Sequence, residues 1–287
     1  MTCVGGNTDL PDVLANTTAV LAAAGADLPV HAGLAHPGGG PAVEVGERWQ
    51  GADGLMGCRP APDASRGRPP LAVVEERATD ALARLAVEGG LTLVPLGPQS
   101  TVADLARAHE AAFARLGRIH FMGGSGSGGN VTPAAEFNVH HDPAAADTVL
   151  RTAGRCGVPV TMYGLEVFGR VRVPPDRVRA LSEAAHPALR LAGRLLLAAA
   201  AKEGAPDATI GDAGAVAALA RPDLVTVRRR PVAVQVDGGP ARGQTVVDRR
   251  ASGPPAGEGW TDVDVVEDVD GAALAAWFVD TLEAFFG

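Results

Sequence analysis

Short apolar runs alternate with helical patterns through the middle of the chain. Residues 91–96 (LTLVPL) predict a buried strand, and residues 118–122 and 158–163 predict two more. Between the first two runs, residues 101–116 carry apolar side chains at helical spacing. This alternation predicts an α/β fold with a mostly parallel central sheet and helices on both faces.

A further helix is predicted to begin at Asp142 and Pro143. Asp is favoured at the N-cap and Pro in the first turn, so the pair marks a helix start. In a Rossmann-like open sheet, ligands bind beyond the carboxyl ends of the strands. The loops after Leu96, Met122 and Tyr163 are therefore expected to share one edge of the sheet and to form the binding site.

The two ends of the chain extend this pattern less regularly. Residues 2–4 predict a strand that begins at once, followed by a helix over 11–24 and a strand over 29–32. We therefore expect the first strand of the sheet to be missing from this sequence. The last part of the chain predicts three short strands and a closing helix, over residues 225–230, 232–236, 245–248 and 271–286. No stretch has the composition of a linker, so residues 1–287 are predicted to form a single domain.

Composition and net charge argue against several kinds of partner and indicate the cellular location. Hydrophobic residues make up 46% of the 287, which is enough to bury a core, and the net charge of −8 argues against a nucleic-acid partner. The three cysteines (Cys3, Cys58 and Cys156) form no CxxC pair, which favours reduced thiols and a cytoplasmic location. No apolar stretch approaches the roughly 20 residues that span a bilayer, and no signal peptide is evident, so no membrane partner is expected.

A glycine-rich segment follows the predicted strand over 118–122. Residues 124–129 (GSGSGG) match the G-x-G-x-x-G pattern of dinucleotide-binding proteins. Such a site requires a helix to begin at the glycines, so that its N-terminus meets the pyrophosphate. Residues 130–138 (NVTPAAEFN) contain Pro133 and lack apolar periodicity, which disfavours that helix. The glycines are therefore expected to form a flexible loop.

Three polar side chains lie close together directly after that loop. Asn130, Glu136 and Asn138 fall within nine residues. Glu136 and Asn138 are two positions apart, so an extended backbone would point both to the same side. One carboxylate and two carboxamides together accept and donate several hydrogen bonds, as the hydroxyls of a sugar ring require. The alternative interpretation is a solvated loop without a ligand.

Several segments in order along the chain carry a family resemblance. The most specific are MGG at 122–124, GNVTP at 129–133, EFN at 136–138 and DPAAA at 142–146. Further agreeing positions are Gly6-Asn7, Asn16, residues 29–33 (PVHAG), 53–55 (DGL), 96–98 (LGP), 164–167 (GLEV), Asp212 and 242–245 (RGQT). Together these segments resemble the inosine-uridine-preferring nucleoside hydrolase family, from Thr2 to about Asp248.

The resemblance implies a reaction and a cofactor. Members of this family cleave the N-glycosidic bond of ribonucleosides to give ribose and free base. They use a calcium ion that holds the ribose diol and the attacking water. By resemblance, Asp212 and the carbonyl of Ser100 would be calcium ligands, and Asn7 would orient the region of the metal and the water. The partner is expected to be a small-molecule ribonucleoside, and the protein is expected to be a homodimer or homotetramer.

The resemblance also assigns side chains to the sugar. Asn130 and Glu136 would bind its outer hydroxyl. Asn138 would lie near the 2-hydroxyl and the ring, where positive charge develops in the transition state. Met122 would pack under the sugar, and Asp212 would contact it as well as the metal.

The sequence departs from the family pattern in two respects that bear on catalysis. The family's Asp-rich segment, D-x-D-x-G-x-D-D, is expected before Thr2 and has no counterpart in this sequence. That segment supplies most metal carboxylates and the general base, so the catalytic residue stays unassigned. In addition, Gly211 stands where well-known members carry a His that protonates the leaving base, and Phe168 replaces a Thr.

Three functional hypotheses therefore stay open. The first is a nucleoside hydrolase whose complete chain carries the Asp-rich segment before Thr2. The second is a catalytically impaired homologue that binds a ribosyl ligand without cleaving it. The third is a non-functional fragment with an open sheet edge.

Overall fold

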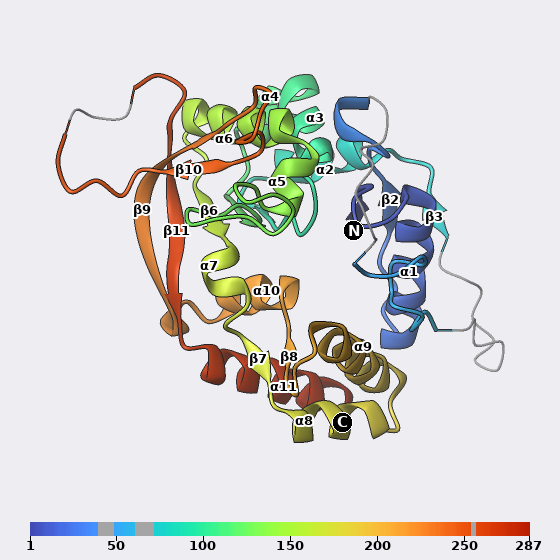
Figure 1. Cartoon of the computed structure of the whole chain (residues 1–287). Coiled ribbons are helices and arrows are strands. Elements are labelled where there is room, and N and C mark those ends of the chain that lie inside the picture. The colour runs from blue at the N-terminus through green and yellow to red at the C-terminus, as the bar shows by residue number, and fades with distance from the viewer. Residues whose placement is uncertain (40–48, 61–71, 254–256) are drawn as a thin grey trace.

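The largest sheet has six strands in the order β10-β9-β11-β6-β5-β4 (Figure 1). A computed structural model describes residues 1–39, 49–60, 72–253 and 257–287. The six strands are β4 (Thr92–Leu93), β5 (Arg118–Met122), β6 (Val160–Tyr163), β9 (Val225–Val234), β10 (Thr245–Val247) and β11 (Thr261–Val269). Strands β4, β5, β6 and β11 are parallel, whereas β9 is antiparallel to β10 and β11. The predicted mostly parallel central sheet is thus confirmed.

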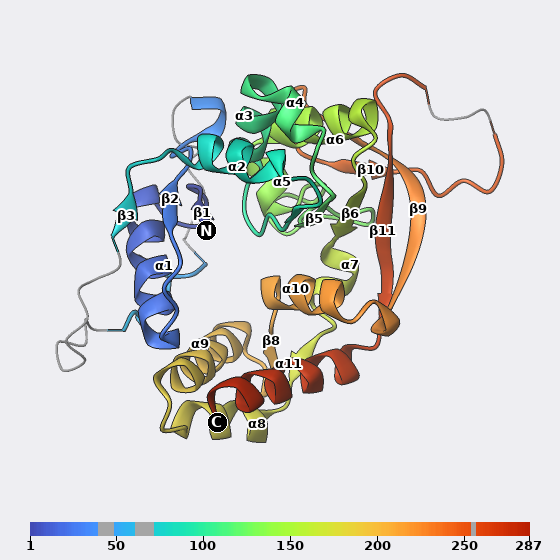
Figure 2. The same cartoon turned by 180° about the vertical axis from the view of Figure 1, so that it is seen from behind.

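Helices cover both faces of this sheet, as the two opposite views show (Figures 1 and 2). One face packs against α2 (Ala78–Val87), α3 (Ser100–Ala108), α4 (Glu110–Phe113) and α6 (Pro143–Cys156). The other face packs against α7 (Leu165–Phe168), α8 (Pro175–Glu183), α9 (Pro187–Glu203), α10 (Asp212–Ala220) and α11 (Gly271–Phe286). Short apolar strands in the middle of the sheet are buried on both faces by this arrangement.

The N-terminal part forms a second, separate sheet. Strands β1 (Thr2–Cys3), β2 (Val30–Ala32) and β3 (Val73–Val74) pair in parallel, next to α1 (Leu10–Ala24) and the short helix η1 (Pro37–Gly39). No ladder of hydrogen bonds joins this sheet to the six-stranded one within the described residues. The N-terminal part meets the rest of the chain through loops and helices. A Cβ atom on Gly6 would lie 2.9 Å from Pro98 Cδ, and Ala23 of α1 packs against Leu191 of α9. The strand expected before Thr2 concerns residues outside this sequence and stays a prediction.

The remaining elements are short. Strands β7 (Arg172–Val173) and β8 (Ala208–Thr209) form an antiparallel pair, and helices α5 (Phe137–His141) and η3 (Pro222–Leu224) are single turns. Of the described helices, none combines the length and the apolar character needed to cross a bilayer. The three cysteines are unbonded thiols, as the composition predicted.

The structure departs from the predicted elements in three places. The helix expected over 101–116 is interrupted at His109, whose backbone leaves the helical region (φ −138°, ψ 52°). The two strands expected over 225–236 form the single long strand β9. Strand β11 was not predicted, although its valines alternate in part with acidic residues (TDVDVVEDV), which is typical of a strand with one buried face.

Candidate functional site

The loops that follow β4, β5 and β6 lie together at the carboxyl edge of the six-stranded sheet. The backbone N–H of Met122, at the end of β5, donates to the carbonyl of Pro95 in the loop after β4 (2.9 Å). On the other side, Leu165 N–H donates to the carbonyl of Gly124 (3.1 Å). The end of β5 and the loop that follows it therefore contact the loops after β4 and β6, and the predicted shared edge is confirmed.

Glu136 is the most deeply enclosed charged side chain at this edge, with 2% of its surface exposed. It is the N-cap of α5, and its Oε1 accepts from Asn138 N–H (2.9 Å). Its Oε2 accepts from Gly124 N–H (2.9 Å) and Val139 N–H (3.1 Å). The carboxylate thus joins the end of β5 to the start of α5, and burial raises its pKa despite these three donors.

The prediction of an extended segment from Glu136 to Asn138 is wrong, because α5 begins at Phe137. A carboxylate at the N-cap satisfies amide groups of the first turn, which favours the helix over an extended chain. The side chains still converge. Asn138 donates from Nδ2 to the carbonyl oxygen (3.2 Å) and to Sδ (3.3 Å) of Met122, so it lies on the end of β5. Met122 and Asn138 are both buried.

Asp212 lies close enough to Glu136 for the two charges to interact. Asp212 begins α10, and its side chain remains partly exposed to solvent. Loss of hydration and the charge of Glu136 raise its pKa from 3.8 to about 7. Two carboxyl groups that are far apart in the sequence therefore share one electrostatic environment at the edge of the sheet.

The other two predicted polar residues lie nearer to the surface. Asn130 is exposed, and its Oδ1 accepts from Phe137 N–H (2.9 Å), which caps the first turn of α5. Asn7 is exposed in the loop between β1 and α1. Asn130, Glu136 and Asn138 thus lie together at the N-terminus of α5. Glu136 and Asn138 are buried there, and Asn130 is exposed.

Ser100 has a structural role in this fold. Its hydroxyl donates to Asp142 Oδ2 (2.7 Å) from the first turn of α3. Asp142 also caps α6 by accepting from Ala145 N–H (3.0 Å), and it accepts from Gly38 N–H (3.0 Å). Ser100 therefore helps to join α3, α6 and the N-terminal part of the chain.

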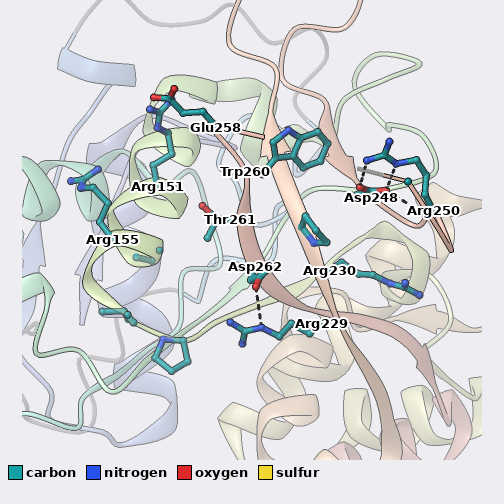
Figure 3. Close-up of a pocket in the computed structure, with 18 of the residues that line it drawn as sticks. Arg151, Arg155, Arg229, Arg230, Asp248, Arg250, Glu258, Trp260, Thr261 and Asp262 are labelled. Carbon is teal, nitrogen blue, oxygen red and sulfur yellow. Dashed lines mark hydrogen bonds and ion pairs between the residues drawn. The ribbon is translucent and has the colours of Figure 1, made fainter. Parts of the chain in front are cut away.

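A pocket of about 970 Å³ lies at the opposite edge of the sheet (Figure 3). It is lined by residues 157–159, which precede β6, and by residues 260–262 around the start of β11. Arginines surround it, but Arg229 pairs with Asp262 (3.5 Å) and Arg250 with Asp248 (2.7 Å), as the dashed lines show. This pocket is separate from the edge that carries Glu136.

Comparison with known proteins decides the family. The sequence model described as "Inosine-uridine preferring nucleoside hydrolase" matches residues 1–276. The chain belongs to this family. It is 31% identical to the pyrimidine-specific ribonucleoside hydrolase RihB of Escherichia coli (strain K12 / DH10B) over 288 residues, which covers 99% of this chain and 86% of that protein.

Solved nucleoside hydrolases have the same fold. The plant nucleoside hydrolase PpNRh1 is 25% identical, with a TM-score of 0.85, over 99% of this chain and 89% of that one. A purine-preferring ribonucleoside hydrolase from Gardnerella vaginalis is 26% identical, with a TM-score of 0.82, over 99% and 89%. The α/β class inferred from the alternating pattern is therefore that of the nucleoside hydrolases.

The calcium ion implied by the resemblance lacks a complete set of ligands in the described part of this nucleoside hydrolase homologue. Calcium takes roughly 6–8 oxygen ligands. Within the described ranges, no three His, Cys, Asp or Glu side chains gather in a way that could hold a metal ion. Asp212 and the Ser100 carbonyl supply at most three protein oxygens from separate helices, so these residues by themselves do not fit a calcium site.

The glycine-rich loop of this family member makes hydrogen bonds to two other segments, and the flexibility predicted for it stays a prediction. Ser125 N–H donates to Thr245 Oγ1 (2.6 Å), and Gly126 N–H donates to Glu166 Oε1 (2.5 Å). No helix begins at these glycines, as expected when the dinucleotide site was rejected. Thr245 and Glu166 lie in segments that carry the family resemblance, but no local pattern in the sequence marks the contacts that they make here.

Proposed function

We propose that the chain binds a ribonucleoside at the carboxyl edge of β5 and β6 and hydrolyses its N-glycosidic bond to ribose and free base. The reaction is that of the family to which the chain belongs. The observation that carries the proposal is the pair of interacting carboxyl groups, Glu136 and Asp212, beside the buried amide of Asn138.

These side chains suit the chemistry of a ribosyl group. Glu136 Oε2 already accepts two backbone N–H groups, whereas Oε1 accepts one and has a further lone pair that can accept from a ribose hydroxyl. Cleavage of the glycosidic bond places positive charge on the ring, as in an oxocarbenium ion. Ionised carboxyl groups that are already oriented stabilise that charge without reorganisation. In its ionised form Glu136 would therefore favour departure of the base, and Asp212 would add to this effect above its pKa of about 7.

The second candidate function is binding of a ribosyl ligand without cleavage. One observation favours it: the described residues include no carboxyl group that the sequence assigns as base for the water, and they do not complete a calcium site. A water without a base or a metal is a poor nucleophile at neutral pH. Sugar binding by Glu136 and Asn138 would still be retained.

Release of reducing sugar from uridine and inosine by the purified chain tests the first function, with calcium added and with a chelator. We expect Glu136→Gln to reduce turnover and Glu110→Gln to preserve it, because Glu110 is an exposed partner of Arg155. Titration calorimetry with ribose and uridine tests binding. Heat of binding without sugar release would favour the second function, and the absence of both would overturn the proposal.

A further inference from the structure

The segment Arg242–Thr245, here called the support segment, contacts both elements that position Glu136. Thr245 is the first residue of β10 and is 2% exposed. Its hydroxyl accepts from Ser125 N–H (2.6 Å) and donates to the Ser125 carbonyl (2.7 Å). One hydroxyl thus satisfies both backbone groups of a buried residue in the glycine-rich loop.

The neighbouring residue in that loop, Gly124, donates its N–H to Glu136 Oε2. Gly124 has a φ of +72°, and a Cβ atom there would lie 2.9 Å from Thr245 Cγ2. The loop therefore approaches Thr245 so closely that only glycine fits next to it. The peptide whose N–H Thr245 binds (Gly124–Ser125) and the peptide whose N–H Glu136 accepts (Gly123–Gly124) are each planar and meet at the Cα atom of Gly124. Holding Ser125 in place therefore restricts the position of the amide that Glu136 accepts from.

The other end of the support segment contacts α5 directly. Arg242 Nη1 donates to the carbonyl of His140 in α5 (2.9 Å). A Cβ atom on Gly243 would lie 2.7 Å from His140 Cα, so the two backbones are in contact. Glu136 is the N-cap of this same helix. The support segment thus contacts the glycine-rich loop on one side and α5 on the other, and Glu136 joins the two.

We propose that Thr245 is a positioning residue for ribosyl binding, which acts through Ser125 and Gly124 on the carboxylate of Glu136. The inference rests on the proposed function, since it assigns Thr245 to the site at which the ribosyl group would bind. Thr245 has no catalytic role in this account. Its hydroxyl sets the distance between the glycine-rich loop and α5. That distance determines the position of the Glu136 carboxylate oxygens relative to the bound sugar.

Thr245→Val and Thr245→Ser test the proposal as a matched pair. Valine keeps the shape of threonine but loses the hydroxyl, whereas serine keeps the hydroxyl. We expect the valine variant to raise KM for uridine roughly tenfold and to lower kcat as well, because Glu136 would contact both the bound sugar and the charged transition state. We expect the serine variant to restore KM to within about twofold of the wild-type value.

Thr261→Val is the control for a purely structural effect. Thr261 is also a buried threonine of the same sheet, on the other side of β9 from Thr245, and it donates to the Leu150 carbonyl in α6 (3.1 Å) and not to the glycine-rich loop. We expect it to lower stability without moving KM. An unchanged KM in Thr245→Val, or an equal rise in Thr261→Val, would overturn the proposal. If Thr245→Val does not fold, Arg242→Gln, which removes the contact to His140, is expected to raise KM in the same direction.

Hydrogen exchange of the ligand-free protein separates this inference from the proposed function. Thr245→Val is expected to speed amide exchange in residues 123–129 and 136–141, and Thr261→Val is not. If the wild-type protein neither binds nor cleaves nucleosides, the proposed function fails. Faster exchange in both segments would then still support the positioning of Glu136 by Thr245, and unchanged exchange would overturn it.

Discussion

The ring of Phe168 occupies the space that a side chain on Gly211 would need. A Cβ atom on Gly211 would lie 2.5 Å from Phe168 Cζ and 2.8 Å from Cε2. Gly211 also has a φ of +48° and precedes Asp212 as the N-cap of α10. Gly211 and Phe168 are both departures from the family pattern. They form one structural feature, because the ring of Phe168 fills the space that the missing side chain of Gly211 leaves.

This contact predicts that Gly211→Ala is destabilising. The new methyl group would collide with the ring, and alanine is strained at positive φ, so we expect a loss of about 1–3 kcal/mol in the free energy of unfolding. Urea denaturation measures the change. Gly169→Ala is the control, because Gly169 has a φ of −78° and no atom within 4 Å of its Cβ position. Adding Phe168→Ala to Gly211→Ala should recover part of the lost free energy of unfolding. If it recovers none, the ring of Phe168 is not the cause of the loss.

Stability should depend on pH through Asp212. Its pKa is raised from 3.8 to about 7, so between these values the folded protein binds more protons than the unfolded chain. The free energy of unfolding therefore falls as pH rises from about 4 to 7. Asp212→Asn removes this titration, and we expect its stability relative to wild type to improve by about 4 kcal/mol from pH 4 to pH 8. Urea unfolding at each pH gives the difference.

Asp248 provides a control, because its pKa is lowered whereas that of Asp212 is raised. Hydrogen bonds from Arg250 lower its pKa to about 2. Its ionised form stabilises the fold above the ordinary pKa of 3.8, and that contribution is lost as pH falls toward 2. Asp248→Asn should therefore be less stable than wild type at pH 7, with a difference that shrinks in acid. If the stabilities of Asp212→Asn and Asp248→Asn relative to wild type change with pH in the same direction, the raised pKa of Asp212 is contradicted.

Asp142 should matter more to stability than an ordinary helix cap. It accepts from Ser100 Oγ, Ala145 N–H and Gly38 N–H, and it is 4% exposed. Asp142→Asn replaces one acceptor oxygen by a donor, and we expect a loss of about 1–3 kcal/mol in thermal or urea unfolding. Asp270→Asn is the matched cap variant, because Asp270 caps α11 through Ala273 N–H alone. Equal losses would show that the additional donors contribute nothing.

Calcium is expected to have little effect on the stability of this chain. A site with a Kd of about 10 μM would stabilise the fold by about 2.7 kcal/mol at about 1 mM calcium. Since the described residues do not fit such a site, we expect the unfolding midpoint to move by less than about 1 °C between calcium and chelator. A larger rise that Asp212→Asn abolishes would show that Asp212 binds the ion.

Local patterns in the sequence were enough for much of the fold. The strand over 118–122, the helix that begins at Pro143 and the closing helix over 271–286 lie where predicted. Each of these depends on nearby residues alone: an apolar run, an N-cap pair or a helical repeat of apolar positions. The alternation of strands and helices likewise fixed the α/β class, because parallel strands need crossover connections.

The candidate site depended on tertiary structure. The sequence spacing predicted that Glu136 and Asn138 lie together because the segment is extended. They do lie together, but the reason is that Glu136 is the N-cap of α5 and Asn138 is in the first turn of this helix. The raised pKa of Asp212 and the contact of Thr245 with Ser125 arise only where segments distant in the sequence approach closely. Burial and close packing of distant segments have no local sequence signature, so only the folded chain shows which polar groups share an environment.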